Sequence, residues 1–208
     1  MPKLLHIASS PRANSASAAA AQVFVDAFCH SRPAWEIDAL DLWREGLPEF
    51  NHDMLDAKDA VMRGAAFTSR QSEAWAIIER MAVRFSLADR VLISTPMWNF
   101  GLPYKLKHYI DLINQPRLTF RFDPATGYIP LLKDRPTIAI VASSGDFVTG
   151  MNRGRTDMAT PYLREALRFM GVRSLEVVRL GPTAGPVEAT RQAHEAAYRR
   201  LRELAARF

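Results

Sequence analysis

Short apolar runs alternate with longer amphipathic stretches along the chain, and this alternation constrains its fold more than any other feature. Four such runs, at residues 3–8, 90–95, 137–142 and 175–180, are typical of strands, and so is the segment 35–42, in which apolar and polar residues alternate. Helical spacing of apolar residues marks 17–29, 73–85, a stretch from about 103, 157–170 and 186–208. The order strand, helix, strand, helix indicates an α/β protein built on a mostly parallel sheet.

Five strands and about five helices fit one architecture best. We predict a doubly wound, five-stranded parallel sheet with the flavodoxin-like order 2-1-3-4-5. The stretch 47–72 is mixed and partly helical, and 117–131 contains a hairpin-like excursion around a turn at 123–127. No repeat, low-complexity segment or linker interrupts the chain, so residues 1–208 are expected to form a single domain. Ser17 is a suitable N-cap for the first helix, and Gly171 a suitable stop for the one at 157–170.

Several protein classes are excluded by composition. The single cysteine, Cys29, cannot form an internal disulfide, and the five histidines lack the spacing of a zinc site. No apolar run approaches the roughly 18–20 residues of a membrane span, and the N-terminus turns polar too soon for a signal peptide. We therefore expect a cytoplasmic protein without a metal and without a membrane partner.

The formal net charge of +5 raises the question of a nucleic-acid partner. The excess lies entirely in residues 153–208, which hold 11 arginines against 6 acidic residues. Its densest part, Arg199, Arg200 and Arg202, falls on a predicted amphipathic helix without interleaved aromatics. We interpret it as a solvated helix face and expect no nucleic-acid partner.

Ligands of open parallel sheets bind beyond the carboxyl ends of the strands, which here lead into loops at 9–17, 95–101 and 143–150. The first loop has no glycine, because the earliest in the chain is Gly46, so it matches neither a dinucleotide fingerprint nor a Walker loop. It carries four serines and Arg12 into a helix N-terminus. This pattern suits one terminal phosphate, although an ordinary serine-capped helix explains it equally well.

The second loop favours a ligand. Met97, Trp98 and Phe100 lie on a loop at the ligand edge of the sheet, where a flat aromatic ligand would contact them and Asn99 would bond its heteroatoms. In the third loop, Gly145 would allow the backbone to approach a ring edge. A monophosphate at one end and a flat heterocycle at the other indicate flavin mononucleotide, FMN.

These motifs resemble the FMN-dependent NADH:quinone oxidoreductases of the azoreductase type. The resemblance runs nearly end to end and rests on Ser9-Ser-Pro-Arg with Ser15 and Ser17, Pro96-Met-Trp-Asn-Phe-Gly-Leu-Pro103, Leu106-Lys-His-Tyr-Ile-Asp111, Thr119-Phe-Arg-Phe122 and Thr160-Pro-Tyr-Leu163. It implies a homodimer with its sites at the subunit interface. The FMN-binding residues it implies are Ser9, Ser15, Ala16, Ser17, Pro96, Met97, Trp98, Asn99, Phe100, Ser143, Ser144, Gly145 and Asp146. Asp146 departs from the second glycine that family members commonly have in this loop, and its carboxylate should alter the flavin potential.

The resemblance implies that NADH or NADPH reduces the flavin and that a quinone or azo compound reoxidises it, in a ping-pong order. Phe120, Phe122 and Tyr128 are candidates for the walls of the substrate pocket, or equally for hairpin packing or a subunit contact. One alternative is a flavodoxin-like electron carrier, although such carriers are usually acidic and this chain is basic. Another is an FMN reductase that releases reduced flavin.

Overall fold

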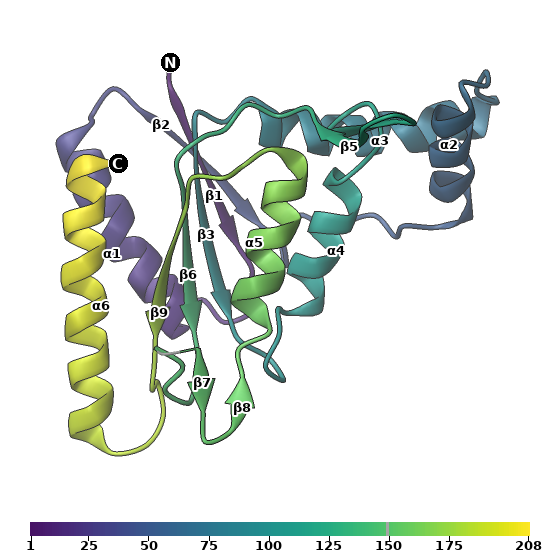
Figure 1. Cartoon of the computed structure of the whole chain (residues 1–208). Helices are drawn as coiled ribbons and strands as arrows, with labels where there is room; N and C mark the ends of the chain where they lie inside the picture. The colour runs from purple at the N-terminus through teal and green to yellow at the C-terminus, as the bar shows by residue number, and fades with distance from the viewer. Residues whose placement is uncertain (149) are drawn as a thin grey trace.

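A five-stranded parallel sheet separates two groups of helices (Figure 1). The computed structural model describes residues 1–148 and 150–208. The strands are β1 (Lys3–Ala8), β2 (Glu36–Asp41), β3 (Arg90–Pro96), β6 (Thr137–Ala142) and β9 (Leu175–Leu180), and they lie in the order β2-β1-β3-β6-β9. This is the order predicted from the sequence, and each pair of neighbours is parallel. The flavodoxin-like, doubly wound fold is therefore confirmed.

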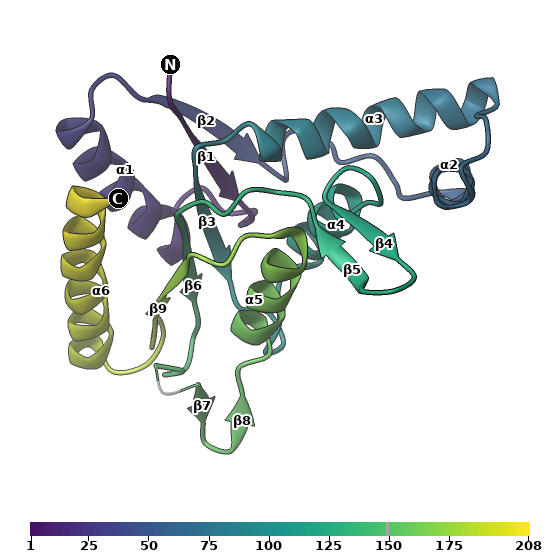
Figure 2. The same ribbon diagram turned by 45° about the horizontal axis from the view of Figure 1, so that its top comes forward.

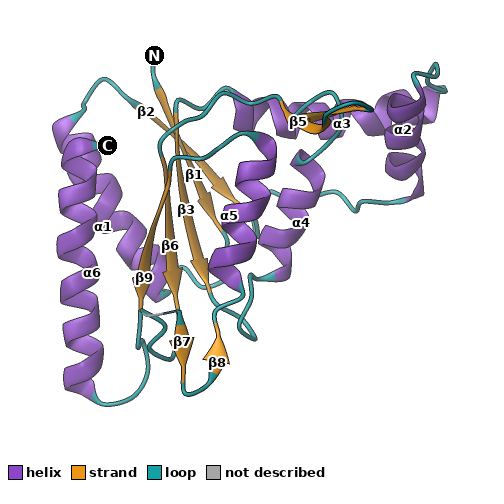
Figure 3. Ribbon diagram, in the orientation of Figure 1, coloured by secondary structure: helices purple, strands orange, loops and turns teal. Residues whose placement is uncertain are grey.

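Helices cover both faces of the sheet (Figure 3). On one face, α1 (Ala16–Ser31) and α6 (Val187–Arg207) pack through Phe24, Phe28 and Leu201 against Leu92 and Ile140 of the strands. On the other face lie α4 (Tyr104–Ile113), α5 (Ala159–Met170) and the C-terminal part of α3 (Ser69–Ser86). The other half of α3 extends away from the sheet and packs against α2 (His52–Arg63), as Figure 2 shows.

Helix ends follow local chemistry. Ser15, and not Ser17, is the N-cap of α1, since its Oγ accepts the N–H of Ala18 at 3.2 Å. The prediction for Ser17 was wrong because the N-cap lies two residues earlier, which puts Ser17 inside the first turn. Gly171 does end α5, as predicted: its φ of 116° is left-handed, and a Cβ there would lie 2.3 Å from the carbonyl oxygen of Leu132.

Two hairpins lie outside the main sheet. In the predicted excursion, β4 (Phe120–Asp123) and β5 (Gly127–Pro130) pair antiparallel. The second hairpin, β7 (Met151–Asn152) with β8 (Arg155–Thr156), lies in a stretch that we expected to be a loop. Thr149, within the third predicted ligand loop, lies outside the described residues. In the part of the chain that the structure covers, no helix has the length and apolar character needed to span a membrane.

Candidate functional site

The carboxyl ends of β1, β3 and β6 lie at the lower edge of the sheet in Figure 1. Residues of the loops that follow these strands line a cleft. Backbone hydrogen bonds join the loops: Ser9 N–H donates to Ser94 O at 3.0 Å, and Met97 N–H donates to Ala142 O at 2.7 Å. The cleft has a volume of about 620 Å³, within the range of small-molecule sites. We call it the three-loop cleft; it is lined by Ser10, Pro11, Arg12, Asn14, Ser15, Ala16, Ser17, Pro96, Met97, Trp98, Ala142, Ser144 and Thr183.

One end of the three-loop cleft is the N-terminus of α1. The N–H groups of Ala16 and Ser17 belong to the first turn, where a helix has no preceding carbonyl to bond, and the helix dipole adds positive potential. The hydroxyls of Ser15 and Ser17 lie 3.2 Å apart, and Arg12 adds an exposed cation. Main-chain donors, hydroxyls and a cation are the groups that bind phosphate at helix N-termini in general, so this end of the cleft has the chemistry that the sequence predicted.

The opposite wall is a strained turn. Trp98 and Gly101 exchange two backbone hydrogen bonds, at 3.0 and 2.9 Å, across a two-residue loop. Both loop residues, Asn99 and Phe100, have positive φ, at 47° and 69°, as in a type I′ turn. Non-glycine residues are rarely held in this conformation, and they cluster at functional sites. The turn leaves the rings of Trp98 and Phe100 more than one-third exposed.

Trp43 connects the two walls, and the sequence analysis missed it. Its Nε1 donates to the carbonyl oxygen of Ser9 at 3.0 Å, in the phosphate-side loop. Its ring lies 6.0 Å from that of Trp98 and 5.4 Å, edge-on, from that of Tyr104. Trp43 lies two residues beyond β2, so the rule that ligands bind beyond the carboxyl ends of strands could have identified it.

The third loop contributes mainly backbone. Ser143 donates its hydroxyl to Gly145 O at 2.8 Å, and its carbonyl accepts both the N–H and the hydroxyl of Thr183, at 2.9 and 3.0 Å. Asp146 accepts the N–H of Val148 at 3.0 Å. Thr183, which follows β9, lines the cleft and was also missed.

The thirteen FMN-binding residues that the resemblance implies fall into two groups. Ser15, Ala16, Ser17, Pro96, Met97, Trp98 and Ser144 come together as walls of the three-loop cleft. The others support the loops without lining the cleft: Asn99 and Phe100 form the turn, and Ser143, Gly145 and Asp146 shape the third loop. Ser9 is fully buried, because its hydroxyl donates to Ser94 O at 3.2 Å inside the sheet.

His6 lies in β1, behind the first loop. Its Nε2 is 2.9 Å from the hydroxyl of Ser94. Burial lowers the pKa of His6 to about 4, an effect that the nearby Asp41 only partly opposes. The imidazole is therefore neutral at physiological pH and supports the loop rather than exchanging protons with a ligand.

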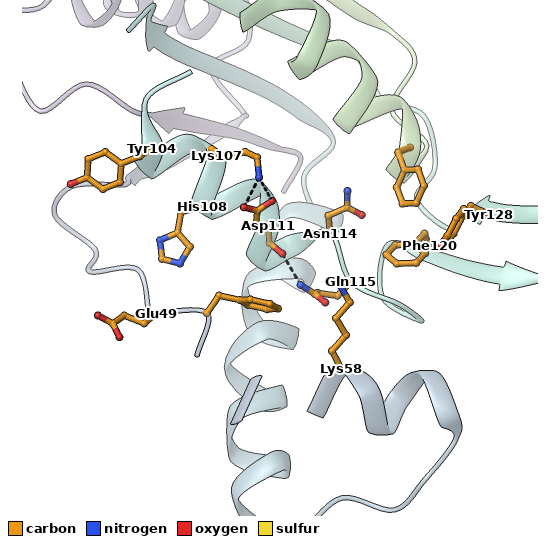
Figure 4. Close-up of a pocket in the computed structure, with 12 residues that line it drawn as sticks. Glu49, Lys58, Tyr104, Lys107, His108, Asp111, Asn114, Gln115, Phe120 and Tyr128 are labelled. Atoms are coloured by element: carbon orange, nitrogen blue, oxygen red, sulfur yellow. Dashed lines mark hydrogen bonds and ion pairs between the residues drawn. The ribbon is translucent and has the colours of Figure 1, made fainter. Parts of the chain in front are cut away.

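Two of the three aromatic residues of the β4–β5 hairpin, Phe120 and Tyr128, line a different cavity, shown in Figure 4. This hairpin cavity, of about 780 Å³, is lined by Phe120, Tyr128 and Phe169, by Tyr104 and the Lys107–Asp111 ion pair of α4, and by residues near α2. Phe120 is buried, whereas Phe122, outside the cavity, and Tyr128 are exposed. Within one chain these side chains therefore do not join the three-loop cleft.

Two polar atoms in the hairpin cavity stand out. Asn114 Oδ1 and Gln115 Oε1 are buried without a hydrogen-bond partner in the described structure. Tyr104 borders this cavity and also packs on Trp43, which packs on Trp98 in the three-loop cleft. A continuous aromatic path therefore links the two cavities. Across residues 1–148 and 150–208, no cluster of three or more His, Cys, Asp or Glu is placed to hold a metal ion.

Comparison with known proteins gives consistent results. A family model described as flavodoxin-like fold matches residues 2–204. A Bradyrhizobium diazoefficiens protein named FMN-dependent NADH:quinone oxidoreductase 1 is 62% identical over 208 residues, covering 100% of both chains. A Desulfotalea psychrophila protein named FMN-dependent NADH:quinone oxidoreductase is 39% identical over 184 residues, covering 88% of this chain and 86% of its own.

The solved structures agree on the fold. An FMN-dependent NADH-azoreductase from Bacillus anthracis, solved in complex with FMN, superposes with a TM-score of 0.86 at 26% identity, covering 99% of this chain and 98% of its own. Another azoreductase from Bacillus anthracis has a TM-score of 0.90 at 24% identity and full coverage of both chains.

Proposed function

This chain belongs to the flavodoxin-like family, among its FMN-dependent NADH:quinone oxidoreductases, and from that premise we propose that it binds FMN in the three-loop cleft and oxidises NADH with a quinone as electron acceptor. The observation that carries the proposal is the pairing, in one cleft, of a helix N-terminus with an aromatic turn. The first suits a phosphate, and the second suits a flat ring system.

The residues present fit FMN well. Arg12, Ser15 and the N–H groups of Ala16 and Ser17 would hold the phosphate. Pro96, Met97 and Trp98 would contact the ring system, while Ser144 and Thr183 supply polar groups on the remaining side. The volume of about 620 Å³ suits one such ligand.

FMN, when bound, supplies the two-electron chemistry, accepting a hydride from NADH and passing two electrons to a quinone. The chain's own residues bind and orient the reactants, and no protein nucleophile or general base is required. We propose that NADH, with NADPH as the alternative donor, and the acceptor occupy the same cleft in turn, in a ping-pong order. Azo compounds are the second class of acceptor in this proposal.

We further propose that two copies of the chain associate through the exposed rings at and beside the hairpin cavity. Tyr104, Phe122 and Tyr128 each expose more than half of their surface, and Tyr104 and Tyr128 line that cavity. Such a dimer could bring one copy's hairpin aromatics to the other's three-loop cleft, which would give Phe120, Phe122 and Tyr128 a role in the substrate pocket. We propose the cytoplasm as location, where NADH is regenerated.

A kinetic panel tests the proposal. Purified protein loaded with FMN should oxidise NADH only when a quinone or azo dye is present, and the panel should cross NADH and NADPH with both acceptors. An electron carrier would show no turnover, and an FMN reductase would need free FMN in excess. A protein that does not bind added FMN would exclude all three functions. Size-exclusion chromatography with light scattering tests the dimer.

A charge substitution tests the phosphate site. Ser15→Asp retains a good N-cap, so the helix should persist, but it places a carboxylate beside the phosphate. Two like charges about 4 Å apart repel by about 1 to 4 kcal/mol depending on exposure, so the Kd for FMN should rise at least about fivefold. Adding Ser17→Asp should expel FMN. Ser69→Asp, at the exposed first turn of α3, is the matched control and should leave FMN binding unchanged.

A further inference from the structure

The arginine excess of the C-terminal quarter has a definite place in the fold. At the amino edge of the sheet, opposite the three-loop cleft, a concave surface of about 670 Å³ lies over the first residues of β6 and β9 and the end of α6. Four arginines line it: Arg90 from β3, Arg164 from α5, Arg173 before β9 and Arg207 from α6. We call this surface the arginine groove; it lies near the top of the molecule in Figure 1.

The chain does not neutralise these charges. Glu176 is the one carboxylate among the groove-lining residues, and it is already shared by Arg200 and Arg207. Among the residues that the structure describes, Arg90, Arg164 and Arg173 form no ion pair. Arg164 bonds only the carbonyl oxygen of Leu175, at 3.4 Å. Arg191 of α6, outside the groove, differs from these three arginines because it pairs with two glutamates.

A neighbouring carboxylate, Asp134, is occupied by other donors. It accepts the N–H groups of Arg173 and Ser174 at 2.7 and 2.9 Å, and the hydroxyl of Ser174 at 2.7 Å. It therefore fixes the backbone at the start of β9 and leaves the Arg173 guanidinium available to a ligand. The groove carries a net positive charge that an anion from solution could pair with.

Arg90 is held ready for such a ligand. Its guanidinium lies over the rings of Trp35 and Phe208, at 5.0 and 5.1 Å from their centroids. Burial, and then repulsion from Arg32, lower the pKa of Arg90, and the carboxylate of Asp89 opposes this shift only in part. Stacking restricts the rotamers of the side chain, so pairing with an anion loses little entropy.

We propose that the arginine groove binds an organic phosphate with an aromatic or apolar part, separately from the FMN site. Planar guanidinium groups match phosphate oxygens with two parallel hydrogen bonds, and several arginines around one concave surface suit a polyphosphate better than a single carboxylate. The half-buried side chains of Leu175 and Val177 form an apolar surface for the rest of the molecule. The concave shape favours a small molecule over the extended backbone of a nucleic acid.

Isothermal titration of the FMN-loaded protein with ADP, pyrophosphate and adenosine tests the proposal. ADP should bind most tightly, pyrophosphate more weakly, and adenosine least. Arg164→Gln with Arg173→Gln should weaken ADP binding at least tenfold. Arg199→Gln with Arg202→Gln removes the same charge from exposed positions of α6 outside the groove and should leave it unchanged.

Each other outcome overturns part or all of the proposal. If ADP binds the groove variant as tightly as it binds the parent protein, its binding site lies elsewhere, for example in the three-loop cleft. Pyrophosphate that binds as tightly as ADP reduces the groove to a simple anion site. Duplex DNA is titrated in the same way. If DNA binds the parent protein more tightly than ADP does, and the groove variant loses this binding, the ligand is a nucleic acid and not a small phosphate. The groove variant should retain its kcat/KM for NADH and quinone, and the binding experiment stands whether or not turnover is observed.

Discussion

Trp43 should control FMN affinity by holding the two walls of the three-loop cleft together. Trp43→Phe removes the Nε1 hydrogen bond to Ser9 O, of 3.0 Å, and keeps a ring against Trp98 and Tyr104. A hydrogen bond of this kind contributes about 1 kcal/mol net, so the Kd for FMN should rise by up to about fivefold. Trp43→Ala also removes two aromatic contacts, each worth about 0.5 to 1.5 kcal/mol, and the Kd should then rise by about 30-fold or more.

The measurement is equilibrium dialysis of FMN against each apoprotein, with urea unfolding in parallel to separate loss of affinity from loss of folding. Trp75→Phe is the matched control, because Trp75 is buried between α2 and α3, away from the cleft. If both Trp43 variants bind FMN as tightly as the parent protein, the two walls hold their positions without Trp43, and our account of the cleft is wrong.

Three further predictions concern the support of the site. The pKa of His6 falls from 6.5 to about 4 on folding, so the unfolded chain binds the proton more tightly than the folded chain does. The free energy of unfolding should therefore drop by about 3 kcal/mol as the pH falls from 6.5 to 4. Urea titrations at several pH values should show this dependence, and His6→Gln should abolish most of it. Phe100→Gly should stabilise the chain by up to about 1 kcal/mol, since glycine adopts a φ of 69° freely. It should also raise the KM for the quinone, because it removes an exposed ring. An unchanged KM would show that Phe100 does not contact the quinone. Gly181→Ala should cost about 2 kcal/mol of stability and weaken FMN binding. The Cβ of the alanine would lie 2.4 Å from Gly145 O and force the third loop to shift. Thermal unfolding measures the loss of stability, and equilibrium dialysis measures the loss of FMN affinity.

The central strands β3 and β6 were predictable because a strand covered by helices on both faces is apolar along almost its whole length. The five residues from Val91 to Thr95 are all buried, as is every residue of β6, and such runs are conspicuous in any sequence. Parallel strands that alternate with helices leave few topologies, so the edge of the sheet where a ligand binds could also be predicted.

The part that each loop residue plays was less predictable, because it depends on contacts with residues far away in the chain. Ser9 looked like a phosphate ligand, yet its hydroxyl bonds Ser94, 85 residues later. Trp43 and Thr183 follow the second and fifth strands, and only the packing of the loops brings them to the cleft.

The sequence by itself determined the layered fold and the edge of the sheet where the three-loop cleft lies, because those follow from periodicity and from the order of the elements. It also predicted a phosphate-and-ring site at this edge, from the residue types next to the strand ends. Only the tertiary structure decided which side chains line the cleft, that Phe120 and Tyr128 of the hairpin line a second cavity, and that arginines distant in sequence form one groove. Local patterns report burial and backbone conformation. Which side chains converge is set by packing between elements far apart in the chain.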